Sequence, residues 1–473
     1  MERRRRKQTS NNNIMYGILG ALLVFLTLSL LIHSCTGTES NKSHISLGGD
    51  SVTPSYVPDP TDAPDADEPY VVGKASIGVT GDIMSHGPVI NSALQEDGTY
   101  DFSKSFQYIA PYYAGYDFMI ANLELTMGGT AAGEYRGYPT FNCPDDIVDG
   151  IKDAGIDLVL TSNNHSYDTG HAGFIRTQEV LNQKGLAYTG TKLSTDSKSY
   201  TIQNINGIKV GMINYTYETE GSSGEKKSVN GLIITDEDAP LINTFNYKKM
   251  DLFYSEVESA VNAMRSDGAD FVMFFIHWGN EYQNSPSNTQ KKIAMQLCEL
   301  GVDVIVGGHP HVVQPMQVLT AESGHKTYCI YSIGNALSNQ RRYEIKEAPE
   351  GHTEDGIIFG VEFKRWSDGR LEISDIHATP LWVSLDQQGD KSTYTILPVD
   401  ISYKSLPAIS TFANTVNNVI DPKRESNLVE AFPVADPSQI GASYNRTMIT
   451  VLPGLNECRA ALGLSPIQNV AGN

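Results

Sequence analysis

Short apolar segments alternate with amphipathic segments from residue 75 onward, and this alternation constrains the fold more than any other feature of the chain. The apolar segments predict five strands, at Ser76–Thr80, Phe118–Ala121, Leu158–Leu160, Val272–Ile276 and Val304–Val306. The amphipathic segments predict helices at Phe174–Lys184, Tyr254–Ser266 and Thr289–Leu300. Strands that alternate with helices favour an α/β fold with a largely parallel sheet and helices on its faces. Two hairpins are also expected, at Ile202–Tyr215 and Ile357–Ile376, because each contains an Asn-Gly or Asp-Gly pair that suits a tight turn.

The N-terminal part of the chain has a different composition. Residues 14–32 are nineteen residues without a charge, enough for one helix across a hydrocarbon layer of about 30 Å. Basic residues in the segment 1–13 precede this run, which predicts a cytoplasmic tail, one transmembrane helix and an extracytoplasmic remainder. A cleaved signal peptide, or a lipoprotein signal at Cys35, is the alternative. The apolar run is long for a signal peptide, however, and bulky Ile32 and His33 suit a lipoprotein signal badly.

The rest of the chain divides into segments of different amino-acid composition. Residues 36–70 are rich in Pro, Asp, Ser and Gly, which is typical of a disordered linker. We expect residues 71–400 to form the folded domain and residues 401–473 a C-terminal extension whose role the sequence does not show. The formal net charge of −20 argues against nucleic acid as a partner. Cys298 and Cys329 lie in apolar runs and are expected in the core.

Polar side chains follow each of the five predicted strands, at the point where the strand ends. They are Asp82, Glu124 with Asn122, Asn164 and His165, His277, and the pair His309 and His311. Ligands of open α/β sheets bind at the carboxyl ends of the strands, so we expect these side chains to converge. Imidazole and carboxylate groups together suit zinc, manganese or iron. The sequence therefore predicts a site for a divalent metal ion.

Each motif alone also has a structural explanation. A Gly-Asp pair after a strand is a common turn, Asn163 to His165 could cap a helix, and a lone His277 could be a core histidine. His309 and His311 are more specific, since alternate residues of an extended segment point the same way. The combination favours the metal site, because turns have no reason to select only side chains that bind metals.

Six motifs carry a resemblance to a known family: GDIM, NLELT, SNNHSYDTG, HWGNEY, GGHPHVVQP and YSIGNALSN. Together they resemble the bacterial capsule-synthesis CapA family, which is associated with poly-γ-glutamate, over residues 75–397. That family is similar to calcineurin-like metallophosphoesterases, which have a two-sheet sandwich flanked by helices and a two-metal centre. The resemblance implies the same fold here, and a protein of the bacterial cytoplasmic membrane.

The resemblance also implies roles for the strand-end residues. Asp82 and His311 would bind a first metal, Glu124 would bridge, and Asn164, His277 and His309 would hold a second. His165 would assist the leaving group or stabilise charge. The phosphoesterase pattern Asp-x-His has Met84 at its third position here, and a thioether is a poor ligand for hard dications. His86 could substitute, so one or two metal ions (Mn, Zn or Fe) are expected.

Two functions follow from these residues and the resemblance. The first is a metal-dependent hydrolase or transferase that acts outside the membrane on an anionic polymer, such as poly-γ-glutamate, or on a phosphorylated envelope precursor. Arg136 and Arg341 are the candidates for holding an anion. The second is a non-catalytic component that binds the polymer or works with other membrane proteins of capsule synthesis and export.

Overall fold

The computed structural model describes residues 68–219, 226–389, 391–399 and 437–467. All of the described residues belong to one compact unit, Glu68–Asn473. The predicted tail 1–13, the predicted transmembrane helix 14–32 and all of the predicted linker 36–70 except residues 68–70 lie outside the described residues. Among the helices that the structure describes, none combines the length and the apolar character needed to cross a membrane.

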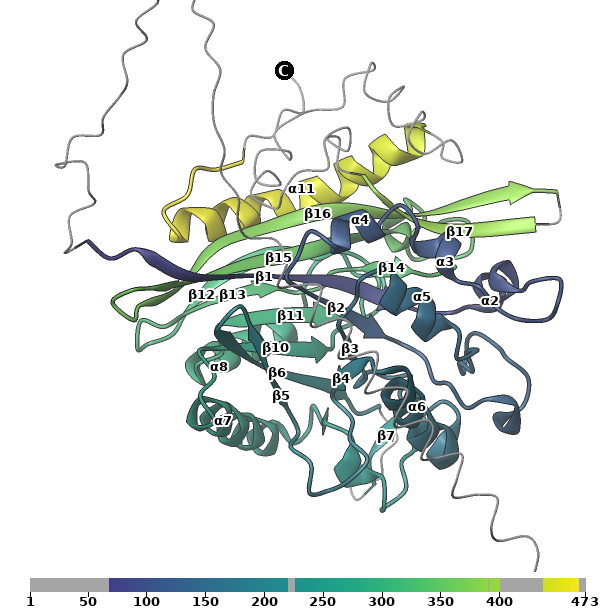
Figure 1. The fold of residues 1–473 in the computed structure, drawn as a ribbon, viewed down its shortest axis with the longest axis horizontal. Helices are drawn as coiled ribbons and strands as arrows, with labels where there is room; N and C mark the ends of the chain where they lie inside the picture. Colours follow the sequence, from purple (N-terminus) through teal and green to yellow (C-terminus); the bar gives the residue numbers. More distant parts are fainter. Residues whose placement is uncertain (1–67, 220–225, 390, 400–436, 468–473) are drawn as a thin grey trace, which may run out of the picture. The chain divides into compact units, whose positions relative to one another are not determined.

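The first sheet of the domain has eight strands (Figure 1). Its order is β17-β16-β15-β1-β2-β3-β4, with β14 paired to β1. Strands β1 to β4 are parallel, whereas β15, β16 and β17 are antiparallel to their neighbours. The strands are β1 (Val71–Ile83), β2 (Phe118–Leu123), β3 (Leu158–Leu160), β4 (Ala187–Thr189), β14 (Asn335–Leu337), β15 (Asp355–Trp366), β16 (Leu371–Gln388) and β17 (Lys391–Pro398).

The second sheet has seven strands in the order β12-β13-β11-β10-β6-β5, with β9 paired to β6. Its centre, β6, β10 and β11, is parallel, and β10 is buried along its whole length, as expected for a continuous apolar run in a parallel sheet. The strands are β5 (Thr201–Ile205), β6 (Ile208–Tyr217), β9 (Thr244–Phe245), β10 (Phe271–His277), β11 (Val304–Gly308), β12 (Met316–Thr320) and β13 (Lys326–Ile330). A small separate hairpin consists of β7 (Ser228–Val229) and β8 (Leu232–Ile233).

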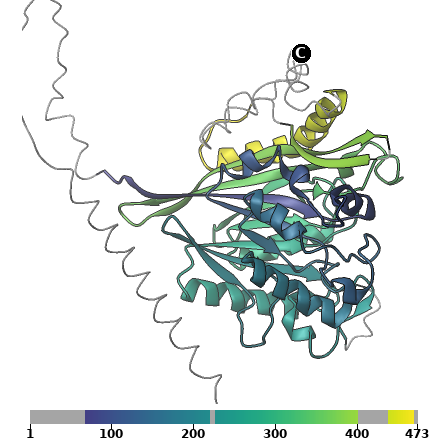
Figure 2. The same ribbon diagram turned by 45° about the vertical axis from the view of Figure 1, so that its right-hand side comes forward.

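Helices flank the two sheets (Figures 1 and 2). One core cluster contains side chains of both sheets, for example Val79 and Phe359 of the first and Met273 and Val306 of the second. A further cluster lies under the helices of the first sheet, and another under α7 and α8 of the second. The helices are α2 (Gly87–Ala93), α3 (Ser103–Phe106), α4 (Ala110–Tyr113), α5 (Ile147–Asp153), α6 (Gly170–Lys184), α7 (Met250–Ser266), α8 (Asn288–Glu299) and α11 (Pro437–Ala461).

Helix α11 belongs to the same core although it follows β17 by a long stretch of sequence. It packs against β16 of the first sheet and β12 of the second. Its apolar stripe joins the cluster between the sheets; the stripe is Ile440, Tyr444, Met448, Val451, Leu455 and Cys458. Two ion pairs fix it, from Arg446 to Asp355 and from Arg459 to Asp375.

The predicted elements are confirmed where the structure describes them. All five predicted strands lie in β1, β2, β3, β10 and β11, and the three predicted helices in α6, α7 and α8. Both predicted hairpins form, as β5–β6 and β15–β16, with Gly207 and Gly369 in the left-handed conformation at their turns. Cys298 and Cys329 are buried in the core as expected. The mixed α/β class is therefore confirmed, with the strands divided between two sheets.

Candidate metal centre

The strand ends of both sheets meet at one place and bring the six predicted ligands together. Asp82 lies near the end of β1, Glu124 follows β2, and Asn164 follows β3. His277 ends β10, while His309 and His311 follow β11. All six side chains belong to residues that are at most 5% exposed. Parallel pairing aligns these ends, since Asp82 is in register with Asn122 and His277 with Gly308.

The ligand-type atoms form two groups that share Glu124. One group is Glu124, His309 and His311, and the other is Asp82, Glu124 and His277; within each, the atoms lie within 4.8 Å of one another. Asn164 Oδ1 lies 2.7 Å from His277 Nε2, and His311 Nδ1 lies 3.0 Å from Asp82 Oδ2. Glu124 thus has the central position that the resemblance implies for it.

Two buried polar atoms in this cluster make no hydrogen bond: Glu124 Oε1 and His309 Nδ1. Glu124 Oε1 has only longer ion-pair contacts, at 3.5 Å from His277 Nε2 and 3.7 Å from His311 Nε2. A buried polar atom without a hydrogen bond costs about 1–3 kcal/mol, so a fold that keeps two of them in one cluster favours a ligand that satisfies both. A dication would bind a carboxylate oxygen and an imidazole nitrogen at once. These residues therefore fit a divalent metal.

The ionisation of Glu124 and His309 suits the same ligand. Burial would raise the pKa of Glu124, but the neighbouring His277 and His311 hold this pKa well below its usual value. Burial, together with His277 and His311, lowers the pKa of His309. An ionised carboxylate and a neutral imidazole are the forms that bind metals. Burial would also lower the pKa of His311, but Glu124 and the hydrogen bond to Asp82 raise it to about 9.

The segment that carries His309 and His311 has a constrained backbone. The φ angles are 91° at His309 and 56° at His311, and the nearby Tyr282 has φ of 63°. Residues other than glycine pay about 1–3 kcal/mol each for such conformations, which persist mainly at functional sites. The left-handed conformation of the two histidines was not expected, because the sequence predicted an extended segment. The two rings still lie close together, with centroids 5.8 Å apart.

A second layer of amides and one phenol orients the ligands. Asn122 Nδ2 donates to Asp82 Oδ1 at 2.8 Å and to Glu124 Oε2 at 3.2 Å. Asn335 Oδ1 lies 3.1 Å from His311 Nδ1, and the Tyr217 hydroxyl lies 3.2 Å from His309 Nε2. Sequence reasoning did not single out these orienting roles. Asn122 and Asn335 do stand inside the motifs NLELT and YSIGNALSN, which was the available signal.

His165 lies beside the cluster and is held by a carboxylate. Its Nδ1 is 2.7 Å from Asp168 Oδ2, which also accepts the Phe141 backbone N–H at 2.7 Å. Asn230, at the turn of the β7–β8 hairpin, donates to Asp168 Oδ1 at 2.8 Å. Burial would lower the pKa of His165, but Asp168 raises it above its usual value. Asp168 was missed from the sequence, although it follows His165 by three residues in SNNHSYDTG.

Met84 and His86 do not complete a further ligand set in the described residues. Met84 is 1% exposed and belongs to the core cluster beneath the first sheet's helices. His86 is in neither ligand group, and burial lowers its pKa to about 4. His86 Nδ1 accepts the Asn339 backbone N–H at 3.2 Å, so the neutral ring carries its proton on Nε2. In that tautomer His86 is a hydrogen-bond donor rather than a metal ligand.

The two arginines expected to hold an anion are engaged elsewhere. Arg136 donates to the carbonyl oxygens of Ala132 and Glu134 in its own loop. Arg341 is buried, donates to Val383 O at 2.6 Å and pairs with Glu354 at 3.4 Å. The structure therefore does not place Arg341 at the metal cluster.

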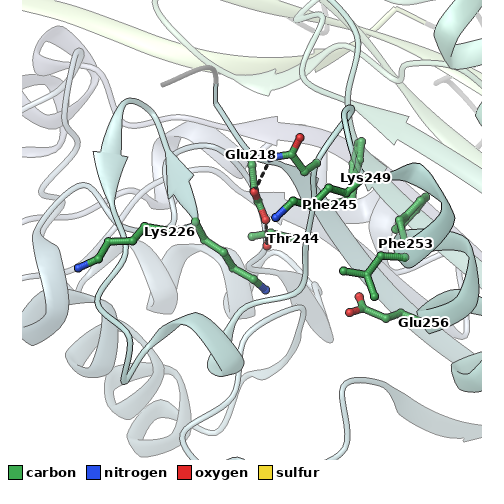
Figure 3. A pocket seen from close by; sticks show the side chains of 10 residues that line it. Glu218, Lys226, Thr244, Phe245, Lys249, Phe253 and Glu256 are labelled. Carbon is green, nitrogen blue, oxygen red and sulfur yellow. Dashed lines mark hydrogen bonds between the residues drawn. The ribbon is translucent and has the colours of Figure 1, made fainter. Parts of the chain in front are cut away.

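A cavity of about 150 Å³ lies beside the N-terminal turns of α7 and includes none of the six ligands (Figure 3). Lys227 and Lys249 line it together with Glu218 and Glu256, while Lys226 points away from the others. Burial lowers the pKa of Lys227 and raises that of Glu256. The two lysines that face this cavity are matched by its two glutamates, so the charges inside it cancel.

Residues 76–340 match the family described as bacterial capsule synthesis protein PGA_cap. The chain belongs to this family. It is 26% identical over 336 residues to the PGA biosynthesis protein CapA of Bacillus subtilis (strain 168), covering 69% of this chain and 79% of the relative. It is 27% identical over 279 residues to the capsule biosynthesis protein CapA of Bacillus anthracis, covering 58% of this chain and 62% of the relative.

The family match confirms the resemblance inferred from the six motifs. The matched segment contains all six predicted ligands, His165 and Asp168, as well as Asn122 and Asn335 of the second layer. Helix α11 lies outside that segment although it packs on the same core. The part that defines membership in the PGA_cap family is thus the part that builds the candidate metal centre.

Proposed function

We propose that this chain is a metal-dependent hydrolase or transferase of capsule or poly-γ-glutamate biosynthesis. The observation that carries the proposal is the presence of two buried atoms that make no hydrogen bond, Glu124 Oε1 and His309 Nδ1, near a histidine held by a carboxylate. The printed names of the two relatives, both CapA proteins, support the biosynthetic role. Asp82, Glu124, Asn164, His277, His309 and His311 would hold one or two ions of Mn, Zn or Fe.

Different residues of the chain would carry out different parts of the reaction. A bound dication would supply a Lewis acid that lowers the pKa of water. His165, oriented by Asp168, would donate a proton to the departing atom. Asn122 and Asn335 would keep Asp82 and His311 in position, as second-layer groups do in metal sites.

The location is part of the same proposal. Residues 14–32 would form a single transmembrane helix in the cytoplasmic membrane, with residues 1–13 inside and the domain outside. The polymer or a phosphorylated envelope precursor would then meet the site at the outer surface. The domain would also be related to metallophosphoesterases, which have a two-metal centre.

The metal content of the purified full-length chain tests the proposal. We expect a stoichiometric dication in the wild type, its loss in His309→Ala and its retention in His171→Ala. His171 is a matched control, since it pairs with Asp238 and is half exposed outside the cluster. Turnover should require both the metal and His165. A wild type that binds no dication at this cluster would refute the proposal.

Met84 favours a second candidate, a non-catalytic component that binds the polymer and works with other membrane proteins of export. Met84 occupies the position where the phosphoesterase pattern has a metal-binding histidine, and its side chain is in the core. Such a component would bind poly-γ-glutamate only when dications are present, because the chain is acidic. Binding that survives chelation would exclude this bridging role.

A further inference from the structure

One tyrosine beside the proposed general acid is exposed, although its position is fixed. Tyr138 is 70% exposed, and its ring centroid lies 6.5 Å from that of His165. The two rings are inclined at 67°, in an edge-to-face arrangement. Phe141 packs on the same imidazole at 4.7 Å, but its side chain is fully buried. Of the two aromatic rings that contact His165, Tyr138 is therefore the one that a ligand can reach.

The backbone around Tyr138 is held on both sides. Before it, Gly137 packs so closely on the start of α2 that a Cβ atom there would overlap the backbone of Gly87. After it, the carbonyl oxygen of Pro139 accepts a hydrogen bond from Asn230 Nδ2 at 2.8 Å. The tyrosine thus projects from a constrained segment. Ordering its ring against a ligand costs only the freedom of two side-chain torsions.

The same contacts connect this segment to the histidine. Asn230 also donates to Asp168 Oδ1 at 2.8 Å. The other oxygen, Asp168 Oδ2, accepts the Phe141 backbone N–H and contacts His165 Nδ1, each at 2.7 Å. A single carboxylate therefore holds His165 and, directly and through Asn230, two points of the segment that follows Tyr138. The exposed ring and the imidazole keep their relative position for this reason.

The position of the ring determines which part of a substrate meets it. A general acid must lie within hydrogen-bond reach of the atom that it protonates, so the departing group lies next to His165. The Tyr138 ring borders that same imidazole from the accessible side. A tyrosine ring has a large apolar face, and a group that covers it is stabilised because both lose exposed apolar surface.

We propose that Tyr138 forms one wall of a subsite for the leaving group, and that it favours leaving groups with an apolar or planar face. This inference rests on the proposed function, because it takes His165 as the proton donor. In that step the bond to the departing atom breaks, and this atom receives the proton of His165. The water or acceptor group that takes its place loses a proton, which restores His165. The preference concerns the departing group alone, so it holds whichever bond is broken.

Two ligands that are not cleaved and differ in one group test the subsite. Phenylphosphonate and methylphosphonate both bind dications through the phosphonate, and they carry a large or a small group in the place of the departing atom. Calorimetry measures the affinity of each for the zinc-loaded full-length chain. We expect the wild type to bind phenylphosphonate about tenfold more tightly, and Tyr138→Ala to reduce this ratio to about twofold or less. Tyr138→Phe keeps the ring and should keep the ratio.

Tyr70→Ala is the matched control, since Tyr70 is 68% exposed and precedes the start of β1, whereas Asp82 lies near the end of that strand. It should keep the wild-type ratio, and His165 should titrate alike by NMR in all variants. A phenyl preference that is absent from the wild type, or that survives in Tyr138→Ala, would overturn the subsite. A shifted His165 titration in Tyr138→Ala would also overturn it, because the effect would then act through His165. A wild type that binds no zinc at the cluster would instead overturn the proposed function, and this inference with it.

Discussion

Asp168 is the residue whose replacement tests the site most directly. Three donors converge on its buried carboxylate: the Phe141 backbone N–H and His165 at Oδ2, and Asn230 at Oδ1. Asn at this position offers one oxygen and one NH₂ group. If the oxygen faces Phe141 and His165, the NH₂ group meets the NH₂ group of Asn230. If the amide flips, the NH₂ group meets a backbone N–H that cannot reverse its role.

The size of the effect follows from this geometry. Either orientation of Asp168→Asn leaves a buried donor without an acceptor, so the free energy of unfolding should fall by about 1–3 kcal/mol. The carboxylate also raises the pKa of His165, so removing its charge lowers that pKa. A general acid must be protonated to act, and activity should therefore be lost at lower pH than in the wild type. Turnover at neutral pH should fall by about 10²–10⁴-fold, the range that a positioned acid supplies.

Histidine-selective NMR titration, denaturant unfolding and the pH–rate profile measure these three quantities. Asp238→Asn is the matched control, since Asp238 is also buried and pairs with a histidine, at 2.9 Å from His171 Nδ1. The Asp238→Asn variant should lose a comparable amount of its free energy of unfolding. Its His165 should titrate as in the wild type, and its turnover should be unchanged. If Asp238→Asn costs as much turnover as Asp168→Asn, or if the His165 titration does not move, the assigned role of Asp168 is wrong.

Three further outcomes are expected. Arg446→Met should lower the free energy of unfolding by about 3–5 kcal/mol in denaturant titrations, because it leaves the buried Asp355 carboxylate unpaired. Arg370→Met removes an exposed ion pair and should change the free energy of unfolding far less. Dication binding must displace the proton of His311, whose pKa is about 9, so affinity should rise with pH up to about 9. Calorimetry in buffers of different ionisation enthalpy should show that about one proton is released at pH 7. A binding enthalpy that is the same in all buffers would contradict this expectation. Gly81→Ala should prevent soluble expression of the folded chain, since its Cβ would overlap a backbone carbonyl of the segment before β14.

The part of the site that could be predicted from the sequence is the part that lies directly after a strand. An apolar run ending in Asp82 or His277 shows both the strand and the direction in which the next side chains point. Both sheets place the carboxyl ends of their parallel strands together, so five local patterns were enough to locate the cluster. The ligands could be found without the tertiary fold for this reason.

Residues that act through other residues could not be found in this way. Asn230 reaches Asp168 from a hairpin 62 residues away in sequence, and no local pattern shows that contact. Arg341 was expected to bind an anion because it follows a site motif, but a buried Glu354 binds it instead. The division into two sheets is likewise a matter of pairing between distant strands, and helix α11 packs on a core whose other members lie far earlier in the chain.

Helix α11 also has a consequence for the order in which the domain can be completed. Its two ion pairs join residues 91 and 84 positions apart, and its apolar stripe covers the seam between the sheets. Because α11 is the last described element in the sequence, these contacts can form only after the strands that carry the candidate ligands have been synthesised. A chain that emerges from its N-terminal end would have every metal ligand available while that seam is still open. The candidate centre could thus be assembled before the domain around it becomes resistant to proteases.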